Sequence, residues 1–349
     1  MKKNISYTVL GAMSGTSLDG LDLAICSFKK NIKWEFKIKK AITYKYPKYW
    51  QKTLQNLHLK NTKKINEINK LFGKYMAEKI NLFIKSEKID FIASHGHTIF
   101  HQPEKKITLQ IGDGKTISEI TKHTTINNFR QLDVSLNGQG APLVPIGDLK
   151  LFPDYKYCLN LGGFANISIK KRNKISAFDI CPVNIVLNTL ARKSGLEYDK
   201  NGNMAKSGEL IPILFEKLNK IEFYSRSAPK SLSREWVEIH IIPLILNNKY
   251  NNKDILHTFC EHIAFQISSY IKNDSTLISG GGAFNTYLIS RIKKLSKTKI
   301  IIPNDTIIKF KEAVIFAFLG ILKIREEINC LKSVTGAIKD NSGGVIHTI

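Results

Sequence analysis

A glycine-rich turn within residues 11–22 most constrains what this chain can fold into. It separates two β-rich segments, residues 7–10 and 21–28, so the pattern predicts a hairpin with a wide tip. A turn that binds phosphate needs free backbone N–H groups, glycine for close approach and hydroxyl donors, and this turn has all three. The residues expected to contact phosphate are Gly15, Thr16, Ser17, Leu18, Asp19, Gly20, Leu21 and Asp22.

The two carboxylates of this turn indicate a metal ion. Mg²⁺ uses few protein ligands and keeps waters, so Asp19 and Asp22 are expected to orient it directly or through water. The turn lacks the lysine of a Walker A loop and precedes a strand rather than a helix, which excludes P-loop and Rossmann sites. An ordinary glycine-rich hairpin with Asx-type hydrogen bonds is the alternative for the turn taken alone.

The second half of the chain repeats this order of elements. A β-rich segment, residues 155–161, runs through a glycine turn into a returning strand, and a third strand over 175–178 ends on Asp179. A later strand, 275–278, stops at a third glycine cluster, where adenine or ribose can lie against bare backbone. The residues expected to contact the nucleotide from this half are Gly162, Gly163, Asn166, Gly280, Gly281 and Gly282.

The periodicity of the remaining chain predicts an α/β protein with two domains. A length of 349 residues with 43% hydrophobic content exceeds what one core usually organises. Two duplicated halves with mixed sheets and facing glycine turns predict a nucleotide held in an interdomain cleft. Apolar residues at helical spacing predict the main helices, at residues 65–84, 184–194, 211–220, 255–271 and 311–325.

The formal net charge of +24 raises nucleic acid as a partner. The lysines are scattered rather than clustered, and neither an RNA-binding aromatic motif nor a helix-turn-helix pattern occurs. We therefore expect no nucleic-acid partner, although a positive field would help to recruit anionic substrates.

Cysteine usage and apolar runs favour a soluble cytoplasmic protein with no membrane partner. No apolar run approaches the roughly 20 residues of a membrane span, and the first residues lead into a strand pattern rather than a signal peptide. The five cysteines are far apart and form no Cys-x-x-Cys pair, so reduced thiols are expected. They are Cys26, Cys158, Cys181, Cys260 and Cys330.

Three histidines, His95, His97 and His101, raise the possibility of a metal cluster. No further cysteine or carboxylate is spaced to complete such a site, which disfavours it. Arg130 and Asp133 lie in a loop between the halves, where arginine suits a carboxylate or a phosphate bidentately and a surface salt bridge is the alternative.

Several long motifs together resemble one family. The chain is similar, from its first strand to its final helix, to the anhydro-N-acetylmuramic acid kinases of the actin-like, hexokinase and Hsp70 ATPase superfamily. The motifs that carry this resemblance are residues 13–20 (MSGTSLDG), 94–103 (SHGHTIFHQP), 109–114 (LQIGDG), 128–133 (NFRQLD), 138–145 (GQGAPLVP), 160–168 (NLGGFANIS) and Glu312-Ala313.

The resemblance implies a two-domain actin-like, ribonuclease H-like fold and a homodimer. Residues 1–130 plus about 326–349 are expected to form domain I, and residues 131–325 domain II. It also implies an ATP-dependent kinase that opens the 1,6-anhydro ring by water attack while the freed O6 takes the γ-phosphoryl group. The products are N-acetylmuramate 6-phosphate and ADP, in peptidoglycan recycling and amino-sugar metabolism.

Site residues follow from motif position. Asp179 is expected to be the catalytic base, and the family pattern gives His95 a sugar contact. Arg130 and Asp133 are expected at the substrate's lactyl carboxylate or a transferring phosphate. Glu312 is expected to bind sugar or assist catalysis, with helix N-terminal charge as the alternative, because acidic residues favour that position.

Residues 179–184 depart from the family pattern Asp-Thr-Gly-Pro-Gly-Asn, because they read Asp-Ile-Cys-Pro-Val-Asn. If this turn met phosphate through bare backbone, Cys181 and Val183 would hinder the approach, and Val183 would resist positive φ. His97 and Phe100 also differ from the family's usual Gln and basic residue. A non-catalytic or altered-specificity protein that binds sugar or nucleotide, and a basic nucleic-acid-associated protein with the same fold, are the rival hypotheses.

Overall fold

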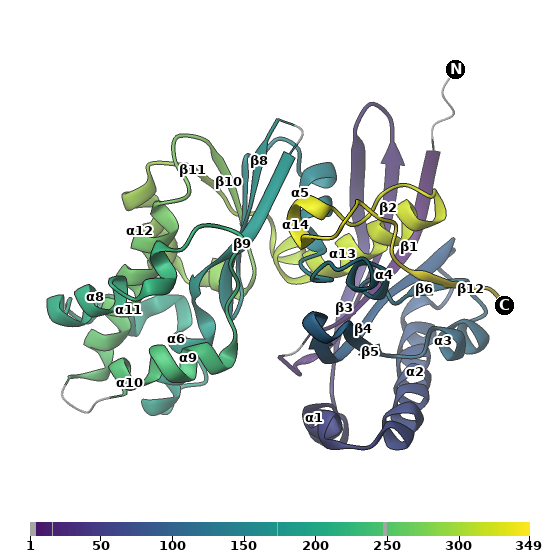
Figure 1. Ribbon diagram of the computed structural model, residues 1–349, viewed down its shortest axis with the longest axis horizontal. Coiled ribbons are helices and arrows are strands. Elements are labelled where there is room, and N and C mark those ends of the chain that lie inside the picture. The colour runs from purple at the N-terminus through teal and green to yellow at the C-terminus, as the bar shows by residue number, and fades with distance from the viewer. Residues whose placement is uncertain (1–4, 16, 173, 247–249) are drawn as a thin grey trace. The chain divides into compact units, whose positions relative to one another are not determined.

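The structure is a computed structural model that describes residues 5–15, 17–172, 174–246 and 250–349. The chain divides into two compact units (Figure 1). One consists of Met1–Phe152 with Phe310–Ile349, and the other is the continuous segment Pro153–Lys309.

The first unit contains a seven-stranded mixed sheet with the order β12-β6-β4-β1-β2-β3, in which β5 pairs with β4. β1, β2 and β3 form an antiparallel meander, and β4 lies parallel to both β1 and β6. The strands are β1 (Ile5–Ser14), β2 (Gly20–Lys30), β3 (Trp34–Lys45), β4 (Phe91–Gln102), β5 (Ile107–Ile111), β6 (Thr125–Asn127) and β12 (Val345–His347).

Helices cover both faces of this sheet. A Cβ at Gly11 on β1 would overlap the carbonyl oxygen of Ala313, so a glycine is needed where α13 crosses β1. The neighbours of Gly11, Leu10 and Ala12, point to the opposite face, where they share a core with Phe72 of α2. The helices are α1 (Lys48–Asn56), α2 (Thr62–Ile84), α3 (Gly114–Thr121), α4 (Gln131–Ser135), α5 (Val144–Leu151), α13 (Asp305–Ile324) and α14 (Lys332–Thr335), with 3₁₀ turns η1 (Leu57–Leu59) and η2 (Pro103–Lys105).

The second unit contains a five-stranded mixed sheet with the order β11-β10-β7-β8-β9. The strands are β7 (Tyr157–Leu161), β8 (Phe164–Lys171), β9 (Lys174–Pro182), β10 (Ser275–Ser279) and β11 (Lys299–Ile301). The helices are α6 (Asn184–Lys193), α7 (Asn203–Lys206), α8 (Pro212–Asn219), α9 (Arg234–His240), α10 (Ile242–Ile245), α11 (Asn252–Ser268) and α12 (Thr286–Ser296), with 3₁₀ turns η3 (Lys200–Gly202), η4 (Glu222–Ser225) and η5 (Gly281–Phe284).

The two sheets share one topology. In each, three antiparallel strands (β1-β2-β3 or β7-β8-β9) are followed by two strands parallel to the first (β4 and β6, or β10 and β11). This repetition confirms the predicted duplicated α/β halves with mixed sheets. None of the helices in the described ranges is long and apolar enough to cross a membrane.

The units begin and end at other residues than the division expected from the sequence, which placed the boundaries at 130 and 325. The segment after residue 130 stays with the first unit because α5 packs on α13, where a Cβ at Gly147 would lie 2.6 Å from Ile315 Cγ1. α13 begins at Asp305 rather than at residue 311, and the boundary at Lys309 falls within it. The part of α13 that packs on the first sheet therefore belongs to the first unit.

Candidate functional site

The first glycine turn joins β1 to β2 as predicted. Thr16, one of the expected phosphate contacts, lies outside the described residues. Gly20 is a glycine for packing reasons, since a Cβ there would lie 2.6 Å from the Tyr44 carbonyl oxygen. Among the described residues, a Cβ at Gly15 would meet only Ser17 Oγ, at 3.6 Å, and Gly15 has no left-handed φ. The fold therefore does not itself require glycine at residue 15, which leaves its backbone open to a ligand.

Burial raises the pKa of the Asp22 carboxyl group to about 6. Thr43 Oγ1 donates a hydrogen bond of 2.5 Å to Asp22 Oδ1, which opposes the rise, while the carboxylates of Glu312 and Asp19 add to it. Among the described residues no group of three or more His, Cys, Asp or Glu side chains is placed to hold a metal ion. Two carboxylates and water fit the ligand preference of Mg²⁺, so Asp19 and Asp22 stay a predicted magnesium site.

A bulge in β4 separates the histidines. Between the pairs Ala12 with Ser94 and Ser14 with His97, β4 has one more residue than β1. Gly96 makes this possible with a φ of 74°, and a Cβ there would overlap the Ile111 carbonyl oxygen. Without the bulge, the two histidines at 95 and 97 would face the same side of the sheet.

The bulge instead turns the two histidines to opposite faces. The His95 ring contacts Phe316 of α13, at 4.6 Å between centroids, and the His97 ring approaches Phe72 of α2, at 6.4 Å. His95 and His97 therefore lie against different helices, on opposite sides of the sheet.

His95 supports Arg130 rather than presenting free ring nitrogens to a sugar. Its Nε2 accepts from Arg130 Nε and Nη2, at 3.1 and 2.9 Å, and its Nδ1 bonds the Gly96 carbonyl oxygen at 2.9 Å. Burial, with Arg130 adding, holds the His95 pKa well below its ordinary value, so the ring is neutral. Arg130 Nη1 also donates to the Gly140 carbonyl oxygen at 2.7 Å. Both ring nitrogens of His95 therefore already have partners within the protein, and its sugar contact stays a prediction.

Glu312 lies inside α13, two turns after its start, and not at a helix N-terminus as the sequence suggested. The helix-dipole explanation for this acidic residue therefore does not apply. Desolvation raises the pKa of its carboxyl although the residue keeps an exposed surface, and Arg130 and Lys311 oppose the rise. Burial lowers the Arg130 pKa to about 10, and Glu312 opposes that change. Arg130 and Glu312 are thus an electrostatic pair beside the first turn's carboxylates.

The Asp133 side chain is closed off from any substrate, which corrects the prediction from the sequence. Its side chain is fully buried, and Oδ1 accepts from Thr335 Oγ1 and Asn341 Nδ2 at 2.9 and 2.8 Å. Cys330 Sγ donates to the same oxygen at 3.0 Å, and Gly140 N donates to Oδ2 at 2.8 Å. Asp133 therefore holds the C-terminal segment and the loop that carries the Arg130 contact.

The second glycine turn joins β7 to β8 and is fixed from behind by helix α6. The Gly163 carbonyl oxygen accepts from the backbone N–H of Val183, and that of Gly162 accepts from Asn184, at 2.8 and 3.2 Å. A Cβ at Gly163 would meet only Ile185, at 4.0 Å, and one at Gly162 would have 3.3 Å to its nearest atom. Neither glycine has a left-handed φ. As at Gly15, the open space at Gly163 suits the approach of a ligand to backbone, whereas a Cβ at Gly162 would be crowded by the Asn160 side chain.

Asp179 lies within β9, which continues to Pro182, and not at a strand end as predicted. It pairs with Asn166 of β8 next to a bulge, and Asn166 is exposed. Its Oδ2 accepts a hydrogen bond of 2.9 Å from Leu232 N, and burial raises its pKa more than this bond lowers it. A carboxylate with a raised pKa beside an open glycine turn can take a proton from water.

The hindrance expected from Cys181 and Val183 does not occur in this structure. Both side chains are fully buried in the core of the second unit. Val183 has a φ of −130°, so the turn does not ask a β-branched residue for a positive φ. The side chains of Cys181 and Val183 fill the core and leave Gly163 open.

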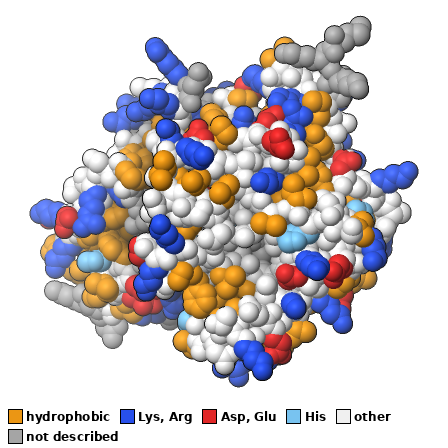
Figure 2. All heavy atoms as spheres, turned by 45° about the vertical axis from the view of Figure 1, so that its right-hand side comes forward, with side chains coloured by type: hydrophobic (Ala, Val, Ile, Leu, Met, Phe, Trp, Pro, Cys, Tyr) orange, Lys and Arg blue, Asp and Glu red, His pale blue; other side chains and the backbone are white. Residues whose placement is uncertain are grey.

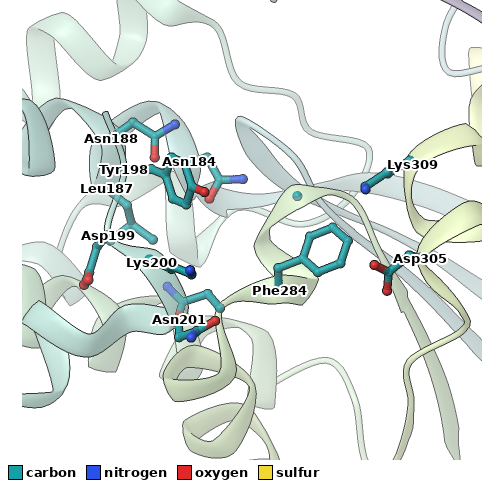
Figure 3. Close-up of a pocket in the computed structure, with 12 residues that line it drawn as sticks. Asn184, Leu187, Asn188, Tyr198, Asp199, Lys200, Asn201, Phe284, Asp305 and Lys309 are labelled. Carbon is teal, nitrogen blue, oxygen red and sulfur yellow. The ribbon is translucent and has the colours of Figure 1, made fainter. Parts of the chain in front are cut away.

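The third glycine cluster borders a cavity of about 540 Å³ in the second unit (Figure 3). Gly280 and Gly282 are glycines because a Cβ would lie 2.6 Å from Asn160 Oδ1 and 2.7 Å from Leu161 Cβ, respectively. Gly281 is exposed and lines the cavity. The lining residues are Asn184, Leu187, Asn188, Tyr198, Asp199, Lys200, Asn201, Gly281, Phe284, Asn285, Asp305 and Lys309.

Sequence reasoning missed most of this lining. Two aromatic rings, Tyr198 and Phe284, together with several amides, give the cavity flat apolar surface and hydrogen-bonding groups, the combination that suits a nucleoside. The sequence feature that points to this lining is the turn Tyr198-Asp199-x-x-Gly202. Asp199 fixes this turn by accepting from Met204 N and Ala205 N, both at 2.9 Å.

Basic side chains do not gather at one place on the face shown in Figure 2. Lys and Arg are dispersed there among acidic and hydrophobic side chains. This dispersion agrees with the scattered lysines of the sequence.

Comparison with known proteins identifies relatives over nearly the whole chain. The family model for anhydro-N-acetylmuramic acid kinase matches residues 7–348. Proteins named anhydro-N-acetylmuramic acid kinase from Sulfurovum sp. (strain NBC37-1) and Francisella tularensis subsp. novicida (strain U112) are both 32% identical, across 94% of this chain and 95% of theirs. The protein of that name from Sulfurimonas denitrificans is 31% identical across 98% of this chain and 100% of its own.

Proposed function

The chain belongs to the anhydro-N-acetylmuramic acid kinase family and is a phosphotransferase, and from this premise we propose its full reaction. The enzyme opens the 1,6-anhydro ring of anhydro-N-acetylmuramic acid with water and transfers the γ-phosphoryl group of ATP to O6. The products are N-acetylmuramate 6-phosphate and ADP, formed in the cytoplasm during peptidoglycan recycling.

The observation that carries this proposal is the buried carboxyl group of Asp179, whose pKa is raised. Its carboxylate takes a proton from the attacking water as the water oxygen bonds to the anomeric carbon. The bond from that carbon to O6 breaks, its electron pair stays on O6, and O6 takes the phosphoryl group as ADP leaves. The raised pKa of Asp179 brings its basicity closer to neutral pH, where a general base works best.

The nucleotide is held by bare backbone and by the cavity of the second unit. The adenosine part occupies the cavity beside Gly281, between the Tyr198 and Phe284 rings. The backbones of Gly15, Gly162 and Gly163 contact phosphate oxygens, because the backbone N–H groups of a glycine turn bind anions. Asp19 and Asp22 would hold Mg²⁺, directly or through water, and the ion would neutralise charge on the phosphates.

The sugar is held by Arg130 and Glu312. The Arg130 guanidinium pairs with the lactyl carboxylate of the substrate, and His95 and Gly140 fix its orientation. Glu312 accepts hydrogen bonds from sugar hydroxyl groups. The functional enzyme is a homodimer.

Product analysis tests this function. Purified protein is incubated with ATP, Mg²⁺ and anhydro-N-acetylmuramic acid, and ADP and phosphorylated sugar are quantified. We expect ADP release that depends on the sugar and matches the phosphosugar in amount. If the wild type forms no more ADP and phosphorylated sugar than the Asp179→Asn variant, the kinase proposal is wrong.

A further inference from the structure

Three buried polar side chains meet directly behind the first glycine turn. Ser14 Oγ accepts a hydrogen bond of 2.7 Å from the Tyr46 hydroxyl and lies 2.8 Å from His97 Nδ1. The three residues are 1%, 3% and 3% exposed, respectively. They come from the end of β1, the residue after β3 and the bulged part of β4, so one small network joins three segments of the sheet.

The surroundings fix each member of this network. The Tyr46 ring packs against Phe72 and Tyr75, with both pairs of ring centroids 6.0 Å apart. His97 reaches the network only because of the bulge at Gly96, and burial lowers its pKa to about 4. The imidazole is therefore neutral at ordinary pH, and its Nδ1 forms one hydrogen bond with Ser14 Oγ, as donor or acceptor according to the tautomer.

Ser14 is the last residue of β1, so its backbone begins the turn that is open to ligand at Gly15. The rest of the turn has contacts of its own. Leu18 N donates to the Gly15 carbonyl oxygen at 3.3 Å, and Gly20 packs on Tyr44. The hydrogen bonds of Ser14 are thus the side-chain anchor at the entry of the turn.

We propose that Tyr46, Ser14 and His97 form a positioning network that sets the backbone of the β1–β2 turn for the phosphates of ATP. This inference rests on the proposed function, since it assumes that the turn contacts phosphate. None of the three residues needs to touch the nucleotide. Their loss weakens the binding of the phosphate chain and leaves the binding of adenosine, in the cavity of the second unit, unchanged.

Tyr46→Phe tests the network with the smallest change, because the ring and its packing remain. Tyr75→Phe is its matched control. Tyr75 belongs to the same aromatic cluster, and within the described ranges its buried hydroxyl has no hydrogen-bond partner. Binding of a non-hydrolysable ATP analogue and of AMP is measured by calorimetry for the full-length wild type and both variants.

We expect Tyr46→Phe to weaken binding of the ATP analogue about tenfold, which corresponds to one lost buried hydrogen bond, and AMP binding less than about twofold. Tyr75→Phe should change neither. Equal weakening of both nucleotides, or unchanged analogue binding, by Tyr46→Phe would overturn the network. So would a wild type that binds the analogue no more tightly than AMP.

His97 variants provide a rescue. His97→Asn keeps a polar atom near the position of Nδ1, whereas His97→Leu removes it. We expect Asn to retain analogue binding within about threefold and Leu to lose about tenfold; equal losses would contradict a hydrogen-bonding role. If His97→Leu does not fold, the comparison of Tyr46→Phe with Tyr75→Phe, together with His97→Asn, still tests the network. A wild type that binds the analogue but makes no phosphosugar refutes the proposed function and leaves this network standing.

Discussion

Asp179 and Asp22 are carboxylates on strands, and burial raises the pKa of both. Neither is neutralised by an ion pair in its surroundings as the structure describes them: Asp179 accepts from a backbone amide and Asp22 from the Thr43 hydroxyl. Folding therefore leaves charge at two places where the proposed chemistry needs it, one for a proton and one for a cation.

Asp179→Asn should lower kcat by at least about a thousandfold, because the amide cannot take a proton from water. ATP-analogue binding should change less than about threefold, since Asn keeps the oxygen that accepts from Leu232 N. Steady-state kinetics and calorimetry measure the two quantities. A variant that loses analogue affinity in parallel with turnover would show that Asp179 has another role.

The pH profile of kcat should also report Asp179 in the wild type. Because burial raises its pKa, activity should fall with acid at a pH above the ordinary aspartate pKa of about 4. The carboxylate is the active form, so the loss occurs as pH decreases. An acid limb at or below pH 4 would contradict the assignment.

Asp22→Asn should stabilise the protein and inactivate it. The folded-state pKa of about 6 lies above the unfolded value of 3.8. Asp22 therefore stabilises the folded protein below pH 3.8, and this contribution is lost as the pH rises through 6. At pH 8 the variant should gain about 1 kcal/mol of unfolding free energy, a figure discounted for the partial exposure of Asp22. The gain should vanish at pH 4. Urea unfolding at both pH values checks it, and an equal gain at both would exclude this cause.

At the scale of elements, the segment Cys181–Val183 fills the core while the glycine turn in front of it stays open. Val183 lies at the start of α6, donates to the Gly163 carbonyl oxygen and points its side chain inward. The segment differs from the family pattern in sequence, yet its bulky groups lie on the side of the backbone away from the turn.

Val183→Gly should therefore destabilise the protein by about 2 to 3 kcal/mol, through a cavity and added backbone freedom. The KM for ATP should stay within about twofold. Val183→Ala is the control, with a smaller loss of about 1 to 2 kcal/mol. If Val183→Gly raised turnover or ATP affinity severalfold, the result would mean that Val183 does crowd the phosphates.

The sequence was sufficient for both hairpins, the main helices and the three glycine clusters, because local periodicity and turn residues encode them. It was insufficient where distant segments decide. The bulge at Gly96 depends on the close approach of β5, so the opposite orientations of His95 and His97 were not visible. Asp133 became structural through partners about 200 residues away, a distance that no local pattern spans.

At the scale of the whole molecule, each compact unit has its own hydrophobic core. The second unit is one continuous segment and contains every residue found to line the cavity proposed for the nucleoside. A chain of residues 153–309 should thus unfold cooperatively and bind AMP within about threefold of the intact protein. Circular dichroism and calorimetry check both. A fragment that folds but fails to bind AMP would place the adenosine site elsewhere.

In the proposed reaction, one enzyme both hydrolyses the anhydro bond and phosphorylates the freed oxygen. The most direct test is the reaction in ¹⁸O-labelled water, with mass spectrometry of the phosphosugar. An unlabelled product kept in labelled water for the same time controls for exchange at the anomeric carbon. The mechanism predicts one solvent oxygen at the anomeric carbon and none in the phosphoryl group. A phosphosugar without solvent oxygen, or with solvent oxygen in its phosphate, would contradict the mechanism.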